Sequence, residues 1–274
     1  MQHVPESRLI VATWNQNGWA NPPFAARAKL LLAKKVDLLC AQELTRSRYE
    51  LFRTALGTDW WGEFSLDVHP AASGGRQWGV AVFGRTKAVG RDVAASAVLD
   101  GPNKDDEGKG KDGSNLGLFW RRSIVVPVIT PGGVRFTAAS IHVRPGATVG
   151  AQKMLFLDNV RALFEQKRTT PLVVGVDTNS SGFYDDGKHE FFVDPERDRE
   201  RRLWTGVGHP LHDTYAAGGS RPHTHVLRNK TGARFDQIWT TPDVTVHGTG
   251  HLAPKGGDGL GTDHAMVLST LAFS

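Results

Sequence analysis

Short runs of branched apolar residues recur along this sequence, and several of them stop abruptly at acids, amides or histidines. Residues 9–12, 37–41, 79–83 and 172–176 are runs of this kind, and each has the length of a buried β-strand. None approaches the roughly 18 apolar residues that a membrane-spanning helix needs. The pattern therefore favours a globular fold whose buried strands end in polar residues.

Helical periodicity lies between some of these runs. The first two runs are separated by apolar residues at helical spacing, which are Phe24, Ala28, Leu31, Leu32 and Val36. A second helix is expected over residues 151–166, before the run at 172–176. Strand–helix–strand units join parallel neighbours, so we expect an α/β fold with mixed sheets.

Four further strands are expected, at residues 123–129, 134–142, 235–239 and 265–268. Pro131-Gly132-Gly133 supplies turn geometry between the first two of them, which predicts a hairpin. Residues 100–115 are rich in Asp, Lys and Gly and are predicted to form a mobile surface loop. No repeat or long linker is visible, so a single domain is expected over residues 1–274.

Net charge and cysteine content bear on the kind of partner and on the cellular compartment. The 33 Lys and Arg exceed the 28 Asp and Glu by five, and this net charge of +5 is compatible with an anionic partner such as nucleic acid. Cys40 is the only cysteine, so an internal disulfide is impossible and a reducing compartment is permitted. Residues 1–7 carry no secretory signal, and we expect a cytoplasmic location.

The polar residues at the ends of the predicted strands carry the chemistry. They stand in the segments 14–18, 42–43, 142, 177–179, 235–236 and 262–264. Burial would penalise such residues unless a function uses them. Oxygen ligands from Glu, Asp and Asn suit Mg²⁺ or Mn²⁺, and a carboxylate beside a histidine, as Asp236 is expected to be beside His264, holds the ring's tautomer.

Each of these signals has an ordinary structural explanation when it is taken alone. A single Asn at a strand end is more often a turn residue, and a single His is more often a half-buried core residue. No protein nucleophile stands out, because Cys40 lies inside an apolar run and Ser180 and Ser181 lack a recognisable nucleophile turn. Attack by an activated water is the better interpretation of the set.

The order of the motifs resembles that of the endonuclease/exonuclease/phosphatase superfamily, which includes DNase I-like and exonuclease III-like nucleases, inositol polyphosphate phosphatases and neutral sphingomyelinases. The matching segments, spread between Leu9 and about Leu268, are residues 13–18, 41–43, 141–142, 176–179, 235–238 and 262–264. The resemblance implies a DNase I-like four-layer sandwich, in which two mixed β-sheets are flanked by helices. It also implies a hydrolase that acts on phosphoester bonds with the help of a divalent metal ion.

The resemblance assigns metal-binding roles to four positions. Glu43 matches the principal metal ligand, Asn15 lies beside it, and Asp263 matches a residue that binds or orients the same ion. Asn17 fits an accessory position near the metal or the phosphate. The implied cofactor is Mg²⁺ or Mn²⁺.

The resemblance also assigns roles in the reaction. Asp177 matches the residue that positions the attacking water or protonates the leaving oxygen, and Asn179 is expected to contact the scissile phosphate. His264, oriented by Asp236, resembles the histidine that activates water or stabilises the transition state. His142 resembles a second histidine of the DNase I-like branch, a candidate general acid or phosphate ligand, where the exonuclease III-like branch usually has tyrosine.

The leading functional hypothesis is a nuclease with DNA or RNA as substrate and partner. The candidates for a phosphate-binding groove are Arg76 and Arg144, together with Arg121, Arg122, Arg221, Arg228, Lys230, Arg234, Trp19 and Trp78. The first alternative is a phosphatase or phosphodiesterase for a small phosphorylated molecule or phospholipid headgroup. The second is a catalytically silent binding module. Every motif keeps an acid, amide or histidine that could act in catalysis, which argues against this alternative.

Overall fold

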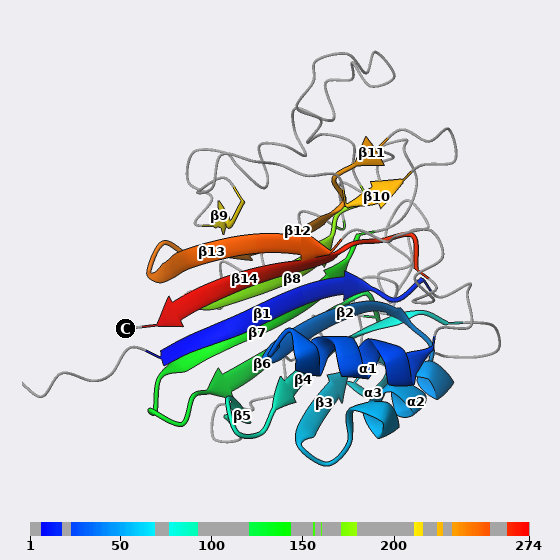
Figure 1. The fold of residues 1–274 in the computed structure, drawn as a ribbon, viewed down its shortest axis with the longest axis horizontal. Helices are drawn as coiled ribbons and strands as arrows, with labels where there is room; N and C mark the ends of the chain where they lie inside the picture. The colour runs from blue at the N-terminus through cyan, green and yellow to red at the C-terminus, as the bar shows by residue number, and fades with distance from the viewer. Residues whose placement is uncertain are drawn as a thin grey trace, which may run out of the picture.

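The computed structural model describes residues 7–17, 23–68, 77–92, 121–143, 156, 160, 171–179, 211–215, 224–226, 232–252 and 262–273. Within these residues the chain forms two six-stranded β-sheets and a separate two-stranded ribbon (Figure 1). The ribbon pairs β10 (His225–Val226) with β11 (Gly232–Ala233).

The first sheet has the strand order β13-β14-β1-β2-β4-β3. Its strands are β13 (Val244–Leu252), β14 (Met266–Phe273), β1 (Ser7–Asn15), β2 (Leu38–Leu44), β4 (Gly79–Arg85) and β3 (Trp60–Phe64). Only β1 and β2 run parallel. Helix α1 (Phe24–Ala33) joins them, as the helical spacing between the two apolar runs predicts.

The second sheet has the strand order β5-β6-β7-β8-β12-β9. Its strands are β5 (Gly90–Arg91), β6 (Ser123–Ile129), β7 (Arg135–His142), β8 (Leu172–Asp177), β12 (Asp236–Thr240) and β9 (His212–Asp213). Again a single pair, β7 and β8, is parallel. The predicted hairpin is present, because β6 and β7 pair antiparallel across residues 130–134.

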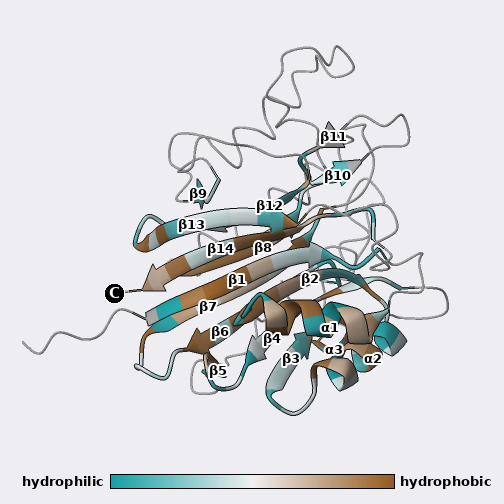
Figure 2. Cartoon of the chain, viewed as in Figure 1, coloured by the Kyte–Doolittle hydropathy of each residue, from teal (hydrophilic) through white to brown (hydrophobic). Residues whose placement is uncertain are grey.

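Three clusters of buried apolar residues define the layers. One lies between the first sheet and its helices and includes Leu31, Phe52 and Phe83. The second joins the inner faces of the two sheets, and the third covers the outer face of the second sheet. In Figure 2 the middle of β1 is apolar, whereas the edge strand β13 is mostly pale. The expected sandwich of two mixed sheets is confirmed.

Helices flank the first sheet on its outer side. Alongside α1 lie α2 (Arg46–Leu56) and the single turn α3 (Ser65–Val68), over the β2-β4-β3 half of the sheet (Figure 1). Within the helix expected over residues 151–166, Phe156 and Val160 are described; both are helical and pack in the third cluster. The loop expected at 100–115 lies outside the described residues. No described helix is long and apolar enough to cross a membrane.

In the first sheet and its helical layer, the strands β3 and β13 and the helices α2 and α3 were not predicted from the sequence. Helix α2 has the signals of a helix, because the Thr45 hydroxyl accepts a hydrogen bond from the Arg48 amide and apolar residues recur at Tyr49, Phe52 and Leu56. Strand β13 has a weak signal, since most of its residues are exposed or half-buried at the sheet edge.

Candidate active site

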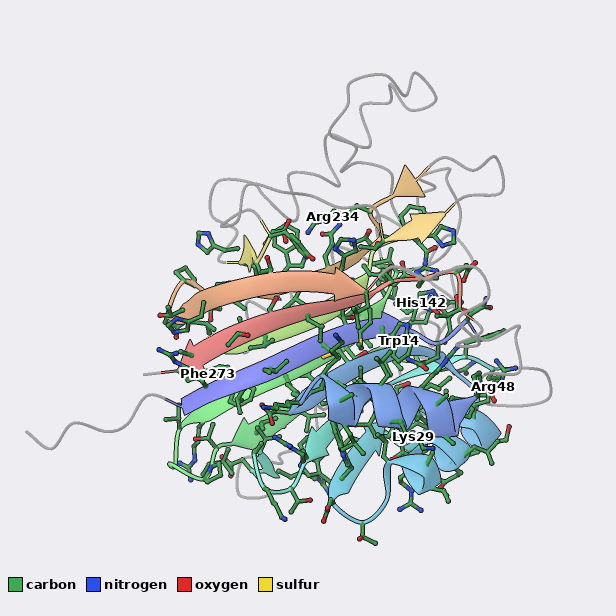
Figure 3. The ribbon with its side chains drawn as sticks, in the orientation of Figure 1. Trp14, Lys29, Arg48, His142, Arg234 and Phe273 are labelled. Atoms are coloured by element: carbon green, nitrogen blue, oxygen red, sulfur yellow. The ribbon has the colours of Figure 1, made fainter. Side chains whose placement is uncertain are left out.

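The topology brings the predicted strand-end residues to one end of the sandwich. Parallel strands end at the same sheet edge, so β1 and β2 carry Asn15 and the segment 42–43 there, while His142 and Asp177 are direct partners at the ends of β7 and β8. Strand β12 runs the opposite way, and its first residue, Asp236, is paired with Asp177. Figure 3 shows His142 at the same end of the strands as Trp14, with Phe273 at the other end.

Backbone strain is concentrated at this end of the molecule. Asn17, Glu43 and Asn179 have φ values of 46°, 58° and 44°, in the left-handed region that residues with a side chain rarely adopt. Glu43 lies in a register shift between β2 and β4, so the chain bulges where the side chain of Glu43 is needed. Three strained non-glycine residues at strand ends are typical of a functional site.

An amide–carboxylate network links the first and second sheets. The Asn15 side-chain nitrogen donates to Asp177 Oδ2 at 2.7 Å, and its Oδ1 accepts the backbone N–H of Asn17 at 2.8 Å. The Asn179 amide N–H donates to Asp177 Oδ1 at 2.9 Å, and its side chain donates to the carbonyl of Val143 at 3.0 Å. Both oxygens of the fully buried Asp177 are therefore fixed in direction.

Asp236 and His264 form the expected carboxylate–histidine pair. His264 Nδ1 lies 2.9 Å from Asp236 Oδ2, and both side chains are buried. Burial opposes protonation of the ring, but the carboxylates of Asp236 and Asp177 outweigh it and raise the pKa of His264 to about 10. Burial and the carboxylate of Asp236 also raise the pKa of Asp177. The pairing leaves His264 Nε2 as the ring atom available to a substrate.

His142 lies between the two sheets with its ring almost fully buried. Its Nε2 is 3.4 Å from Glu43 Oε1 and 3.7 Å from Asp177 Oδ2, yet it has no hydrogen-bond partner among the described residues. Nδ1 contacts the Arg122 guanidinium at 2.9 Å. Burial, Arg122 and His264 together lower the pKa of His142 well below its usual value.

The described residues contain three groups whose ligand atoms all lie within 4.8 Å of one another. They are Glu43 with His142 and Asp177, Asp177 with Asp236 and His264, and Asp263 with His225 and His264. Glu43 and Asp263, both expected to serve one ion, do not share a group. The first group best suits a hard cation, since its two carboxylates, Glu43 and Asp177, offer oxygen ligands.

The candidates for a phosphate-binding groove are buried, partly buried or outside the described residues. Arg234 is buried and its guanidinium contacts both oxygens of Asp213 at 2.7 Å, so it is a structural ion pair and does not line a groove. Arg121, Arg122 and Trp78 are partly buried. Arg76, Arg144, Arg221, Arg228, Lys230 and Trp19 lie outside the described residues.

Cys40 and His225 differ in how far the sequence indicated their environment. Cys40 is fully buried in β2, and burial raises the pKa of its thiol to about 12, which makes it inert as a nucleophile. His225, which the sequence did not single out, lies against His264, with the two rings tilted by 34° and their centroids 4.4 Å apart. An isolated bridge between His225 and His264 holds β10 at the site, and the neighbouring Thr224 hydroxyl accepts the backbone N–H of Asp236. No periodicity or motif signals that contact.

Fold and site together define a class of phosphoester hydrolases built on a sandwich of two mixed sheets. The chain belongs to the Endonuclease/Exonuclease/phosphatase family, whose profile matches residues 12–264. Members of that family hydrolyse phosphoester bonds and depend on divalent metal ions. No curated protein sequence matches the chain.

Solved structures show the same fold at low sequence identity. An endonuclease/exonuclease/phosphatase protein from Bacteroides vulgatus is 17% identical with a TM-score of 0.71, covering 97% of this chain and 99% of its own. A Bacteroides thetaiotaomicron mannosyl-6-phosphatase is 16% identical with a TM-score of 0.67, covering 97% and 100%. D. rerio TDP2, complexed with a single-strand DNA product, is 14% identical with a TM-score of 0.62, covering 97% and 99%.

Proposed function

We propose that this protein is a metal-dependent nuclease that cleaves phosphodiester bonds of DNA or RNA by attack of an activated water. The observation that carries the proposal is the convergence, at one end of the sandwich, of the His264–Asp236 pair and the fixed carboxylate of Asp177. The His264 imidazole and the buried Asp177 carboxylate give the site two separate groups that can act on the attacking water and on the leaving oxygen.

Asp177, His264 and Asn179 have separate tasks in the proposed reaction. Asp177, whose pKa is raised by burial, is positioned to hold the attacking water or to exchange a proton with it or with the leaving oxygen. His264, held through Nδ1, presents Nε2 to the phosphoryl oxygens, where positive charge stabilises the growing negative charge. Asn179 is proposed as a contact to the scissile phosphate.

Glu43 and Asn15 are the proposed holders of the divalent ion, with Asp177 and His142 beside them. A Mg²⁺ or Mn²⁺ ion bound there would neutralise phosphate charge and lower the barrier to attack. Asp263 is exposed and lies beside His225, so we propose that it acts on the substrate side of His264 rather than as a partner of Glu43. Asn17 supports Asn15 through its backbone N–H.

Nucleic acid is the proposed substrate because the chain is basic and a DNA complex is known for a protein of this fold, D. rerio TDP2. The mannosyl-6-phosphatase of the same fold supports the alternative, a phosphatase for a small phosphorylated molecule. A cytoplasmic location is part of the proposal, as the single cysteine fits a reducing compartment.

A substrate panel tests the proposal. Purified protein is incubated with supercoiled plasmid, single-stranded DNA, RNA, abasic DNA and small phosphoesters, each with Mg²⁺ or Mn²⁺ and with chelator. We expect nicking or degradation of a nucleic acid that chelator abolishes. Release of phosphate from small esters without nucleic-acid cleavage would favour the phosphatase, and nucleic-acid binding without hydrolysis under either ion would refute both.

A further inference from the structure

Arg122 makes two contacts with His142 at the end of the second sheet. Its backbone carbonyl accepts the His142 N–H at 2.8 Å, and its guanidinium lies 2.9 Å from His142 Nδ1. The position follows from the register, because Ser123 at the start of β6 is the partner of Ile141, which places Arg122 opposite His142. The side-chain contact is thus anchored by the sheet itself.

The chemistry of the two groups decides which ring nitrogen carries the proton. Arginine has donors only and stays charged, so it cannot accept a hydrogen bond from Nδ1. Nδ1 must therefore be the acceptor, and the neutral ring carries its hydrogen on Nε2. That hydrogen faces the site, since Nε2 lies 3.4 Å from Glu43 and 3.7 Å from Asp177 and has no hydrogen-bond partner among the described residues.

We propose that Arg122 is a positioning residue that locks His142 in the Nε2–H tautomer, so that His142 donates a hydrogen bond to a phosphoryl oxygen of the substrate. This separates the two roles that the resemblance leaves open for His142. A general acid needs hydrogens on both nitrogens, and a guanidinium facing Nδ1 excludes the second one. The task toward a phosphoester rests on the proposed function, whereas the tautomer rests on the contact with Arg122 alone.

The tautomer is read directly by NMR of the histidine side chains in metal-free, ¹⁵N-labelled protein, with His142 assigned by comparison with His142→Gln. Protonated and unprotonated ring nitrogens have distinct ¹⁵N shifts. We expect hydrogen on Nε2 in the wild type and in Arg122→Lys, which keeps a donor. Arg122→Glu presents an acceptor and is expected to move the hydrogen to Nδ1. Arg121→Glu, the same charge change one residue away, should leave the tautomer as it is.

Turnover links the tautomer to the reaction. Arg122→Glu is expected to lower kcat about 100-fold, the effect of losing one donor to the transition state, while Arg122→Lys keeps most of its turnover. In a His142→Ala background the difference between Arg122→Glu and Arg122→Lys should vanish, because the two residues act as one unit.

Two results would overturn the proposal. One is hydrogen on Nδ1 in the wild type, and the other is a loss from Arg122→Glu that persists undiminished without His142. The thermal unfolding curve of each variant shows whether it folds, and the ring spectrum of the wild type decides the tautomer if Arg122→Glu does not fold. Absence of turnover in the wild type would refute the proposed function, while the ring spectrum would still decide the tautomer.

Discussion

At the scale of single residues, the candidate site is a set of polar groups held by contacts that remove their freedom. Asp177 receives hydrogen bonds on both oxygens, and His264 is fixed through Nδ1. Glu43 and Asn179 hold left-handed backbone conformations of a kind that clusters at functional sites. Orientation, more than residue identity, is what the fold supplies.

The His264–Asp236 pair makes the metal-free protein sensitive to pH. Because the folded pKa of His264, about 10, lies above its usual value of 6.5, the pair's contribution to stability is complete below pH 6.5 and is lost as pH rises through 10. We expect the difference in free energy of unfolding between wild type and His264→Gln to shrink over that range. Urea titrations with chelator at several pH values measure it, and a difference that stays constant would contradict the assignment.

Sequence order predicted which residues meet, but their contacts required the fold. The pairing of Asp236 with His264 was predictable, because each stands at the start of a predicted strand and a histidine at a site needs an orienting carboxylate. The contacts of Arg122 with His142 and of His225 with His264 were not, since they depend on strand register and on the pairing of β10. Arg234, a candidate for the groove, is instead buried against Asp213, a partner 21 residues away in the sequence.

At the scale of elements, the two parallel pairs β1–β2 and β7–β8 create the site. Each pair brings two carboxyl ends to the same edge, and the bulge in β2 turns Glu43 toward it. Apolar runs and helical spacing predicted all four strands, and predicted the first pair as a strand–helix–strand unit. They did not predict α2 and the edge strand β13, because a helix with a mixed surface and an exposed strand have little apolar periodicity.

Close contact between β8 and β2 predicts the cost of a small substitution. A Cβ added at Gly175 would stand 2.3 Å from Cys40 Cβ and 3.0 Å from Thr13 Cβ, both in the buried interface between the sheets. We expect Gly175→Ala to lower the free energy of unfolding by about 1–3 kcal/mol. Urea denaturation measures the change. In contrast, Gly250→Ala on β13 meets no atom within 4 Å and should lose far less, and equal losses would refute the close approach.

At the scale of the whole molecule, the site depends on how the two sheets face each other. Gln42 joins them, because its side-chain nitrogen contacts Thr13 Oγ1 at 3.0 Å in the first sheet and Ser140 Oγ at 3.2 Å in the second. Glu43 follows Gln42 directly in the sequence. The residue proposed to hold the ion is therefore next to the residue whose hydrogen bonds join the two sheets. Sequence alone predicted two mixed sheets only through the family resemblance, since periodicity cannot set how sheets stack.

Metal binding should therefore stabilise the fold as a whole. A Mn²⁺ concentration 100-fold above its Kd is expected to add about 2.7 kcal/mol to the free energy of unfolding, seen as a rise in Tm. Glu43→Gln should abolish most of that rise. Glu50→Gln, the same change on the exposed face of α2, should keep it. A rise that survives in Glu43→Gln would place the ion elsewhere.

The central claim is that Asp177 and His264 carry phosphodiester hydrolysis, and metal-dependent nicking of plasmid DNA by alanine variants tests it most directly. Turnover is measured for wild type, Asp177→Ala, His264→Ala and, as a control, Asp243→Ala in an exposed turn. We predict that the two site variants each lose at least about 100-fold while the control stays unchanged. Unchanged metal-dependent turnover in both site variants would contradict the account.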